Sequence, residues 1–175
     1  MKPWINALLF QIAWFGVVYF TSLGQFGVVS AVCLTTLSLH FAFSSKRQSE
    51  SILILSTLIL GILCDGLLQQ LHVLDLYQDH NIQGLIPFWL MFLWALFATT
   101  INSSLAWFHN HKVLSSLAGG VGGALSYYAG SQFGIVHFEK FGPVISLSVV
   151  AVVWAILTPS LMWLGEKVGR LKDLK

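Results

Sequence analysis

The chain has 175 residues, of which 56% are hydrophobic and 9% are charged, and its formal net charge is +2. A soluble domain carries about 25% charged residues, so this composition excludes an ordinary water-soluble globular protein. The small net charge gives no basis for binding nucleic acid, and spanning helices of roughly 20 residues would leave no room for a second domain.

Six apolar segments follow one another along the chain, separated by short polar breaks. Each has the length and composition of a helix that crosses a bilayer. They predict an all-α, polytopic membrane protein in which residues 1–175 form a single transmembrane domain. The predicted bundle of six transmembrane helices comprises residues 4–21, 25–43, 52–72, 87–108, 113–136 and 143–164.

Positively charged residues gather at every second break between these segments. Cytoplasmic loops of membrane proteins are rich in Lys and Arg, so both termini are predicted to be cytoplasmic. Tryptophans near the segment ends (Trp4, Trp89, Trp107 and Trp163) are interpreted as interface anchors. The basic residues at alternate breaks are Lys2, Lys46, Arg47, Lys112, Lys167, Arg170, Lys172 and Lys175, and Lys140 is the exception.

The third segment contains Asp65, the one acidic residue predicted to lie within the hydrocarbon. A charged side chain there costs about 2.5–3.5 kcal/mol on insertion scales, so Asp65 must face protein or water. Helical spacing places Gly61, Asp65, Gln69 and His72 on one face. Two interpretations stay open: a proton or substrate path with His72 at its mouth, or a buried hydrogen-bonding strut between helices.

Counting the helical rise groups the remaining intramembrane polar residues into two layers. Because buried polar groups in lipid need partners, the members of each layer are expected to point toward one another. The inner layer comprises Gln11, either Ser56 or Thr57, and Asn102. The outer layer comprises Asp65, Gln69, Ser126 and Tyr127, and the depth count suggests a hydrogen bond between Tyr127 and Asp65.

Small residues form a narrow face along the fifth segment. The face favours tight packing of this helix at the centre of the bundle, and a glycine-lined ligand groove is the alternative. It could also receive a protein partner or a second copy of the chain. Its glycines are Gly119, Gly122, Gly123 and Gly130.

Neither a metal site nor a cofactor is predicted. The outer-loop residues His72, Asp75, Asp79 and His80 have metal-ligand side chains, but they are interpreted as a solvated loop. The chain has no histidine box, nucleophile elbow or phosphate loop, so an enzyme is the least favoured class.

Several segments resemble a family of short bacterial inner-membrane proteins of unknown function. They are residues 6–15, the segment around Asp65, residues 102–107, and above all residues 119–130. The resemblance covers nearly the whole chain and implies a multi-pass protein of the bacterial inner (cytoplasmic) membrane. Members of the family are often encoded near lipid-modifying enzymes of the cyclopropane fatty-acid synthase type, which implies a lipid context and no residue role.

Two functional hypotheses follow. The first is a small transporter or permease for a small or lipid-like solute, with Asp65 as a protonatable site in the membrane. The second is a membrane-embedded accessory or partner of lipid-modifying enzymes, in which Asp65 is structural. Membrane lipids are the expected surroundings in both cases.

Overall fold

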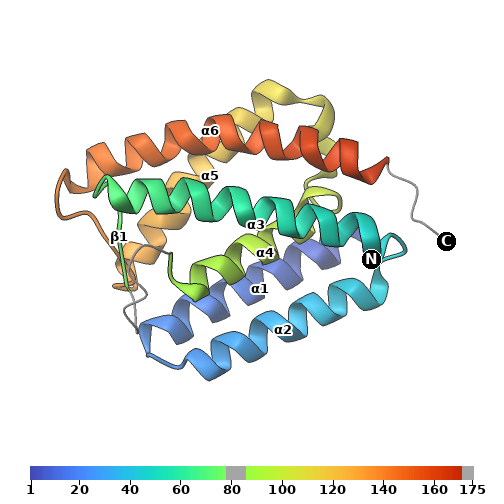
Figure 1. The fold of residues 1–175 in the computed structure, drawn as a ribbon, viewed down its shortest axis with the longest axis horizontal. Helices are drawn as coiled ribbons and strands as arrows, with labels where there is room; N and C mark the ends of the chain where they lie inside the picture. The colour runs from blue at the N-terminus through green and yellow to red at the C-terminus, as the bar shows by residue number, and fades with distance from the viewer. Residues whose placement is uncertain (78–85, 171–175) are drawn as a thin grey trace.

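The computed structural model describes residues 1–77 and 86–170. Within these residues the chain forms six α-helices, one short 3-10 helix and two short strands (Figure 1). The α-helices are α1 (Pro3–Ser22), α2 (Phe26–Phe43), α3 (Arg47–Gln70), α4 (Phe88–Ile101), α5 (Lys112–Gln132) and α6 (Gly142–Gly169). The 3-10 helix is η1 (Ala106–Asn110), and the strands are β1 (Asp75–Leu76) and β2 (Val136–His137).

Four of the helices, α1, α2, α3 and α6, are long and apolar enough to cross a membrane. The α5 helix has 21 residues but is rich in glycine and serine. The α4 helix is strongly apolar but has only 14 residues, so it rises about 21 Å, less than the roughly 30 Å of a hydrocarbon core. The chain is thus a multi-pass, all-α membrane protein, and the count of six spans stays a prediction.

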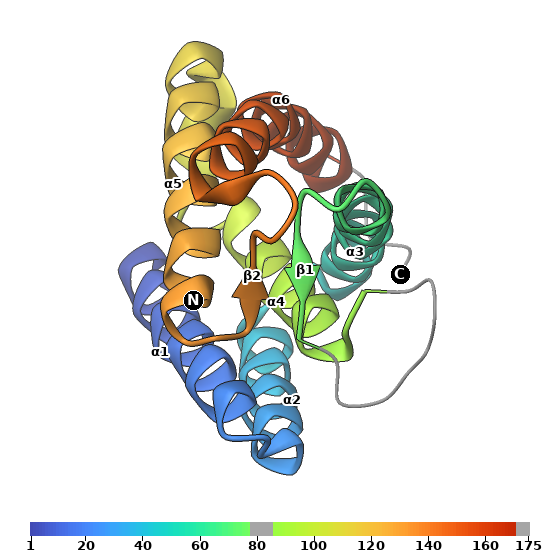
Figure 2. The same ribbon diagram turned by 90° about the vertical axis from the view of Figure 1, so that its left-hand side faces the viewer.

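The centre of the bundle is occupied by α4. Nine of its 14 residues are buried, and the end-on view shows it surrounded by the other helices (Figure 2). A helix that is apolar on all sides is expected to be enclosed by protein in this way. The prediction that residues 113–136 form the central helix was therefore wrong, because α5 lies at the periphery and packs along α6.

Met1 and the C-terminal end of α6 lie at one end of the bundle, on the right in Figure 1. The Met1 amine lies 3.5 Å from the carbonyl oxygen of Phe43, at the end of α2. At the same end, Lys46 Nζ donates a hydrogen bond of 2.6 Å to the carbonyl of Gly169. This arrangement agrees with the alternating basic breaks, and the cytoplasmic location of this end stays a prediction.

Residues 87–108 do not form the single helix that was predicted. The α4 helix ends at Ile101, and the chain continues through turns into η1. The helix ends here because Ser104 bonds to α1 instead of continuing α4. Its backbone N–H and its hydroxyl both donate to Asn6 Oδ1, at 3.3 and 2.7 Å. Asn and Ser side chains offer the backbone such alternatives to helical hydrogen bonds.

The other helix ends differ from prediction by a few residues. The α3 helix stops at Gln70 and α5 at Gln132, each shortly before a residue with positive φ: His72 at 57° and Gly134 at 72°. A left-handed residue cannot continue a right-handed helix, so both helices end before the predicted boundary. In contrast, α6 runs five residues further than predicted, to Gly169.

At the end opposite the termini, β1 and β2 pair antiparallel and join the α3–α4 and α5–α6 connections (Figure 2). Trp89 extends this join, because its Nε1 donates to the carbonyl of Tyr77 at 3.0 Å. Only 2% of Trp89 is exposed. Its interpretation as an interface anchor was therefore wrong, and it belongs to the core.

Candidate functional site

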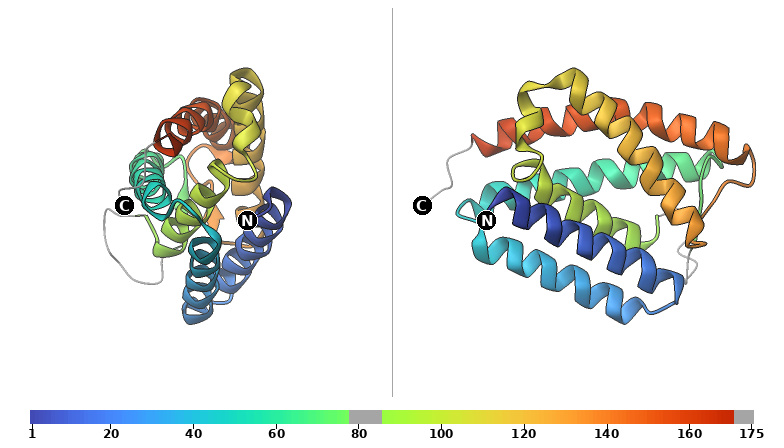
Figure 3. Two further views of the ribbon diagram at one scale, coloured as in Figure 1. Left: turned by 90° about the vertical axis from the view of Figure 1, so that its right-hand side faces the viewer. Right: turned by 180° about the vertical axis from the view of Figure 1, so that it is seen from behind.

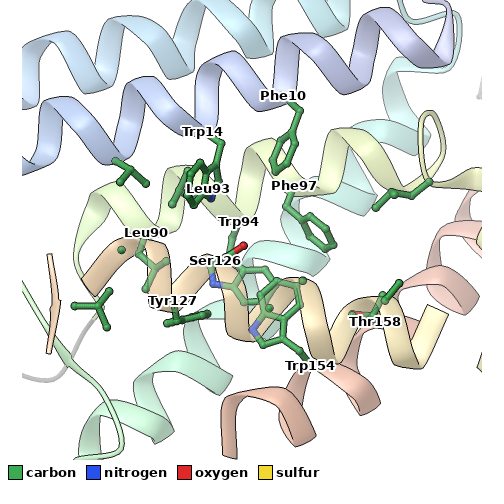
Figure 4. A pocket seen from close by; sticks show the side chains of 18 of the residues that line it. Phe10, Trp14, Leu90, Leu93, Trp94, Phe97, Ser126, Tyr127, Trp154 and Thr158 are labelled. Carbon is green, nitrogen blue, oxygen red and sulfur yellow. The ribbon is translucent and has the colours of Figure 1, made fainter. Parts of the chain in front are cut away.

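An apolar cavity forms a groove between α1 and α5, with α4 as its floor (Figure 4). Its volume is about 280 Å³, and most of its lining is aromatic, aliphatic or glycine. Its lining residues include Phe10 and Trp14 from α1, Trp94 and Phe97 from α4, Gly122, Ser126 and Tyr127 from α5, and Trp154 from α6. We call this space the groove.

The groove exists because its two flanking helices pack on different partners. The α1 helix packs against α2 and α4, whereas α5 packs mainly against α6. From behind, α4 is visible between α1 and α5 (Figure 3, right). Gly122 lines the groove and is also exposed, so the groove opens at the surface between the two helices.

Both helices that flank the groove also carry exposed apolar side chains. On α1, Leu8 and Ile12 are exposed, and on α5, Val121 and Leu125 are exposed. In a bilayer, such side chains face the acyl chains of lipids rather than water. An opening between two such helices would face the hydrocarbon of a bilayer.

Asp65 stands directly behind the groove wall. One carboxylate oxygen, Oδ1, accepts a 2.5 Å hydrogen bond from the Tyr127 hydroxyl, and the other, Oδ2, accepts a 2.7 Å bond from Trp94 Nε1. Only 1% of Asp65 is exposed, and Asp65 is not itself part of the lining. The hydrogen bond between Tyr127 and Asp65 that the depth count suggested is present. The carboxylate ties three helices together and fixes two aromatic rings of the groove.

The Trp94 indole is held on both faces. One face stacks on Trp154 of α6, with ring centroids 4.9 Å apart and an angle of 10° between the planes. Gly61 of α3 also lies directly against the indole, because a Cβ at that position would fall 2.2 Å from Cδ2 of the ring. Since α3 supplies both Gly61 and Asp65, it sets the position and the hydrogen bond of Trp94.

The glycines of α5 separate into two groups. A Cβ on Gly119 would lie 2.1 Å from Thr158 Oγ1, and a Cβ on Gly123 would lie 2.3 Å from Cγ of Trp154. These glycines therefore allow close contact with α6. By contrast, a Cβ on Gly122 would meet nothing within 4 Å. Gly130 packs against Val136, where a Cβ would lie 2.9 Å from Cγ2.

Pro159 is compensated by a hydrogen bond from α5. A proline inside a helix lacks the N–H that would donate to the carbonyl four residues earlier, here that of Ala155. Ser116 Oγ donates to this carbonyl at 2.6 Å. The α6 helix continues through Pro159, so the small face of α5 supplies a hydrogen bond as well as space.

The structure does not assemble the inner polar layer that was predicted. Gln11 is exposed, and the Thr57 hydroxyl is buried without a hydrogen-bond partner in the described part of the chain. Asn102 caps the end of α4 and lies against α6, where a Cβ on Gly165 would fall 2.8 Å from its Oδ1. Depth counting failed here because it gives the height of a residue but not the direction of its side chain.

The outer layer is assembled in part. Asp65 and Tyr127 meet, and Ser126 lines the groove beside Tyr127. Gln69 is half-buried, and its Oε1 has no hydrogen-bond partner in the described part of the chain. His72 is exposed in the connection after α3, 3.7 Å from Asp75, so it does not extend a polar stripe into the bundle. Asp79 and His80 lie outside the described residues.

Sequence reasoning missed the aromatic residues that form the groove. Trp14, Trp94 and Trp154 lie well inside their segments, whereas interface tryptophans lie near segment ends. This unusual position was a usable signal. Asn6 was also missed: it is buried near the start of α1, and its Nδ2 donates to the carbonyl of Thr99 at 3.2 Å.

A second cavity of about 440 Å³ lies at the end that holds the termini. Its charged groups are largely engaged with one another. His40 Nε2 is 3.1 Å from Glu50 Oε2, and Arg170 pairs with Glu166. Polar contacts of this kind stabilise the helix ends, and they leave the groove as the better-formed candidate site for an apolar ligand.

Comparison with known proteins places the chain in a family. The family model described as "Protein of unknown function (DUF2878)" matches residues 3–160, so the chain belongs to this family. No curated protein and no solved structure matches the chain.

Proposed function

We propose that this protein binds the alkyl chain of a membrane lipid in the groove and thereby carries or presents a lipid-like solute within the bilayer. The observation that carries the proposal is the apolar groove itself, which opens at the surface between α1 and α5, two helices with exposed apolar side chains. A ligand can enter such a groove from the hydrocarbon without crossing water.

The size and lining of the groove suit an alkyl chain. An apolar cavity of about 150 Å³ accepts benzene, so about 280 Å³ has room for a longer stretch of hydrocarbon. The stacked indoles of Trp94 and Trp154 and the nearby ring of Phe97 provide a rigid wall. Gly122 keeps the opposite side open. Ligand sites commonly combine such apolar walls with a few polar groups.

In this proposal Asp65 is a positioning residue. Its carboxylate holds Trp94 and Tyr127 from behind, and both of its oxygens are engaged. This differs from the transport hypothesis in which Asp65 itself carries a proton. The lipid-like solute of that hypothesis is retained, and the aromatic wall replaces the carboxylate as the surface that contacts it.

A bound chain can be detected through the tryptophans of the groove. Purified protein in detergent is titrated with a fatty acid brominated along its chain, because bromine quenches nearby indole fluorescence. The parent protein should show saturable quenching. Gly122→Leu fills the opening. We expect it to raise the fatty-acid concentration needed for half-maximal quenching at least tenfold.

Gly66→Leu is the matched control. Gly66 lies on α3 away from the groove, and a Cβ there also meets nothing within 4 Å. This variant should bind like the parent. Equal binding by the parent and Gly122→Leu, or no saturable quenching in the parent, would contradict the proposal.

The second candidate is a membrane-embedded partner of lipid-modifying enzymes. The observation that favours it is the same lateral opening, because a chain held there stays accessible to a neighbouring membrane protein. Under this hypothesis, mild detergent extraction should co-purify a lipid-modifying enzyme with the chain. Isolation of the protein alone, with lipid bound, would favour carriage.

A further inference from the structure

The groove contains two polar groups whose hydrogen-bonding capacity is unused. Trp14 extends from α1 and Ser126 from α5 into the space between the two helices (Figure 4). Both are half-buried. In residues 1–77 and 86–170, neither the indole N–H of Trp14 nor the hydroxyl of Ser126 takes part in a hydrogen bond.

The depth of these two groups makes the lack of partners significant. Trp14 lies about 16 Å along α1 from Pro3, and Ser126 lies about 21 Å along α5 from Lys112. Both distances fall well inside a hydrocarbon core of about 30 Å, where water does not satisfy polar groups. An unsatisfied polar group in an apolar setting is destabilising, so a ligand that bonds to it is favoured.

Other polar groups of the groove are already engaged. The N–H of Trp94 and the hydroxyl of Tyr127 both donate to Asp65. The Thr158 hydroxyl is buried without a partner, but it is pressed against Gly119 at the α5–α6 contact. Trp14 and Ser126 are therefore the groups that face a ligand from opposite sides.

We infer that the groove selects an alkyl chain that carries an oxygen able to accept hydrogen bonds from Trp14 and Ser126. This inference rests on the proposed function and narrows its ligand class. An indole N–H only donates, and a hydroxyl can donate, so an ester, ether or carbonyl oxygen satisfies both groups. A plain hydrocarbon chain leaves both unsatisfied.

The position of the oxygen has a consequence for the lipid. The ester oxygens of a resting phospholipid lie near the interface, whereas Trp14 and Ser126 lie deeper. The oxygen is supplied either by a chain modified along its length or by a lipid whose head end has moved into the groove. The two sources share one chemistry, and ligands with the oxygen at different places distinguish them.

The test is a competition in detergent micelles at fixed detergent concentration. A dibrominated hexadecane serves as the quenching probe, and it is displaced by hexadecane, dioctyl ether or methyl palmitate. These competitors have similar chains with no oxygen, a mid-chain ether oxygen and a terminal ester, respectively. The midpoint of displacement is measured, so the loss of one fluorophore in Trp14→Phe does not affect the comparison.

In the parent protein, the ether or the ester should displace the brominated probe at a lower concentration than hexadecane does. Each hydrogen bond formed should lower the midpoint of displacement roughly two- to tenfold. Ser126→Ala and Trp14→Phe should each reduce this preference, and the double variant should abolish it. The hexadecane midpoint should stay the same in all variants. Ser148→Ala is the matched control, because Ser148 bonds to Val144 on the exposed side of α6.

A lower displacement midpoint for the ether than for the ester points to a chain modified along its length. A lower midpoint for the ester points to a lipid whose head end has moved into the groove. Equal midpoints for all three competitors in the parent overturn the inference and leave chain binding intact. A preference that persists in the double variant also overturns it. Failure of the probe itself to bind removes the proposed function and the inference together.

Discussion

The two sides of α5 carry the same residue type and face different surroundings. Gly123 lies against the Trp154 indole of α6, whereas its neighbour Gly122 faces open space in the groove. On the first side, glycine permits two helices to approach. On the second, glycine keeps a cavity open. The comparison shows that one glycine-rich stretch can permit close helix packing on one face and leave a cavity open on the other.

Gly123→Leu should have the largest effect on stability. The new side chain would start 2.3 Å from Cγ of Trp154 and force α5 away from α6. We expect the free energy of unfolding to fall by about 3 kcal/mol, at the upper end of the range for overpacking. Denaturant unfolding in detergent measures this loss.

Gly122→Leu is the control for that prediction, since it places the same side chain one residue away. It should unfold within about 0.5 kcal/mol of the parent while losing chain binding. Similar losses of stability in both variants would mean that the two faces do not differ as described.

Asp65→Asn should have the next largest effect. A carboxylate accepts from both Tyr127 and Trp94, but an amide places an N–H₂ group against one of these donors. The expected loss is about 2 kcal/mol, with looser packing of Trp94 visible in near-ultraviolet circular dichroism. Asp75→Asn, in the partly exposed connection after α3, should change stability by less than about 0.5 kcal/mol.

Gly61→Ala tests the other support of Trp94. The added methyl would lie 2.2 Å from the indole, whereas Gly66→Ala on the same helix would meet nothing within 4 Å. We expect Gly61→Ala to cost about 1–2 kcal/mol and to weaken chain binding, because the groove wall shifts. Thermal unfolding and bromine quenching measure the two effects. Unchanged bromine quenching in Gly61→Ala would argue against a rigid wall formed by Trp94.

Ser116→Ala should have the smallest of these effects. It removes the hydrogen bond to the Ala155 carbonyl that Pro159 leaves free, and the expected loss is about 1 kcal/mol with chain binding intact. Ser148→Ala, which removes a bond to a carbonyl of its own helix, should cost less. If the two serine variants are equally stable, the bond from α5 does not support α6.

The sequence was sufficient to predict a multi-pass α-helical protein and the start of five of the six α-helices to within one residue, whereas α3 begins five residues before the predicted start. It also indicated that Asp65 and Tyr127 lie at one depth, and they are in contact. It could not show that α4 is central, because a short apolar helix and a lipid-facing helix have similar compositions. Nor could it show that α4 ends where Ser104 bonds to Asn6, since this hydrogen bond joins residues 98 positions apart.

The groove was harder to predict for the same reason. Periodicity places Gly122 and Gly123 about 100° apart around α5, and only the position of α6 decides which of them is covered. The mid-segment positions of Trp14, Trp94 and Trp154 were the available signal. Their convergence depends on three helices that are distant in the sequence, which a single chain read alone does not reveal.

Labelling with a photoactivatable lipid tests the central claim most directly. A fatty acid with a diazirine along its chain is incorporated with the protein into nanodiscs, irradiated, and the modified residues are located by mass spectrometry. We expect labels inside the groove, on Trp14 and Ser126, that disappear in Gly122→Leu and persist in Gly66→Leu. Labelling confined to outward side chains such as Leu8 and Leu125, and unchanged in Gly122→Leu, would contradict the account.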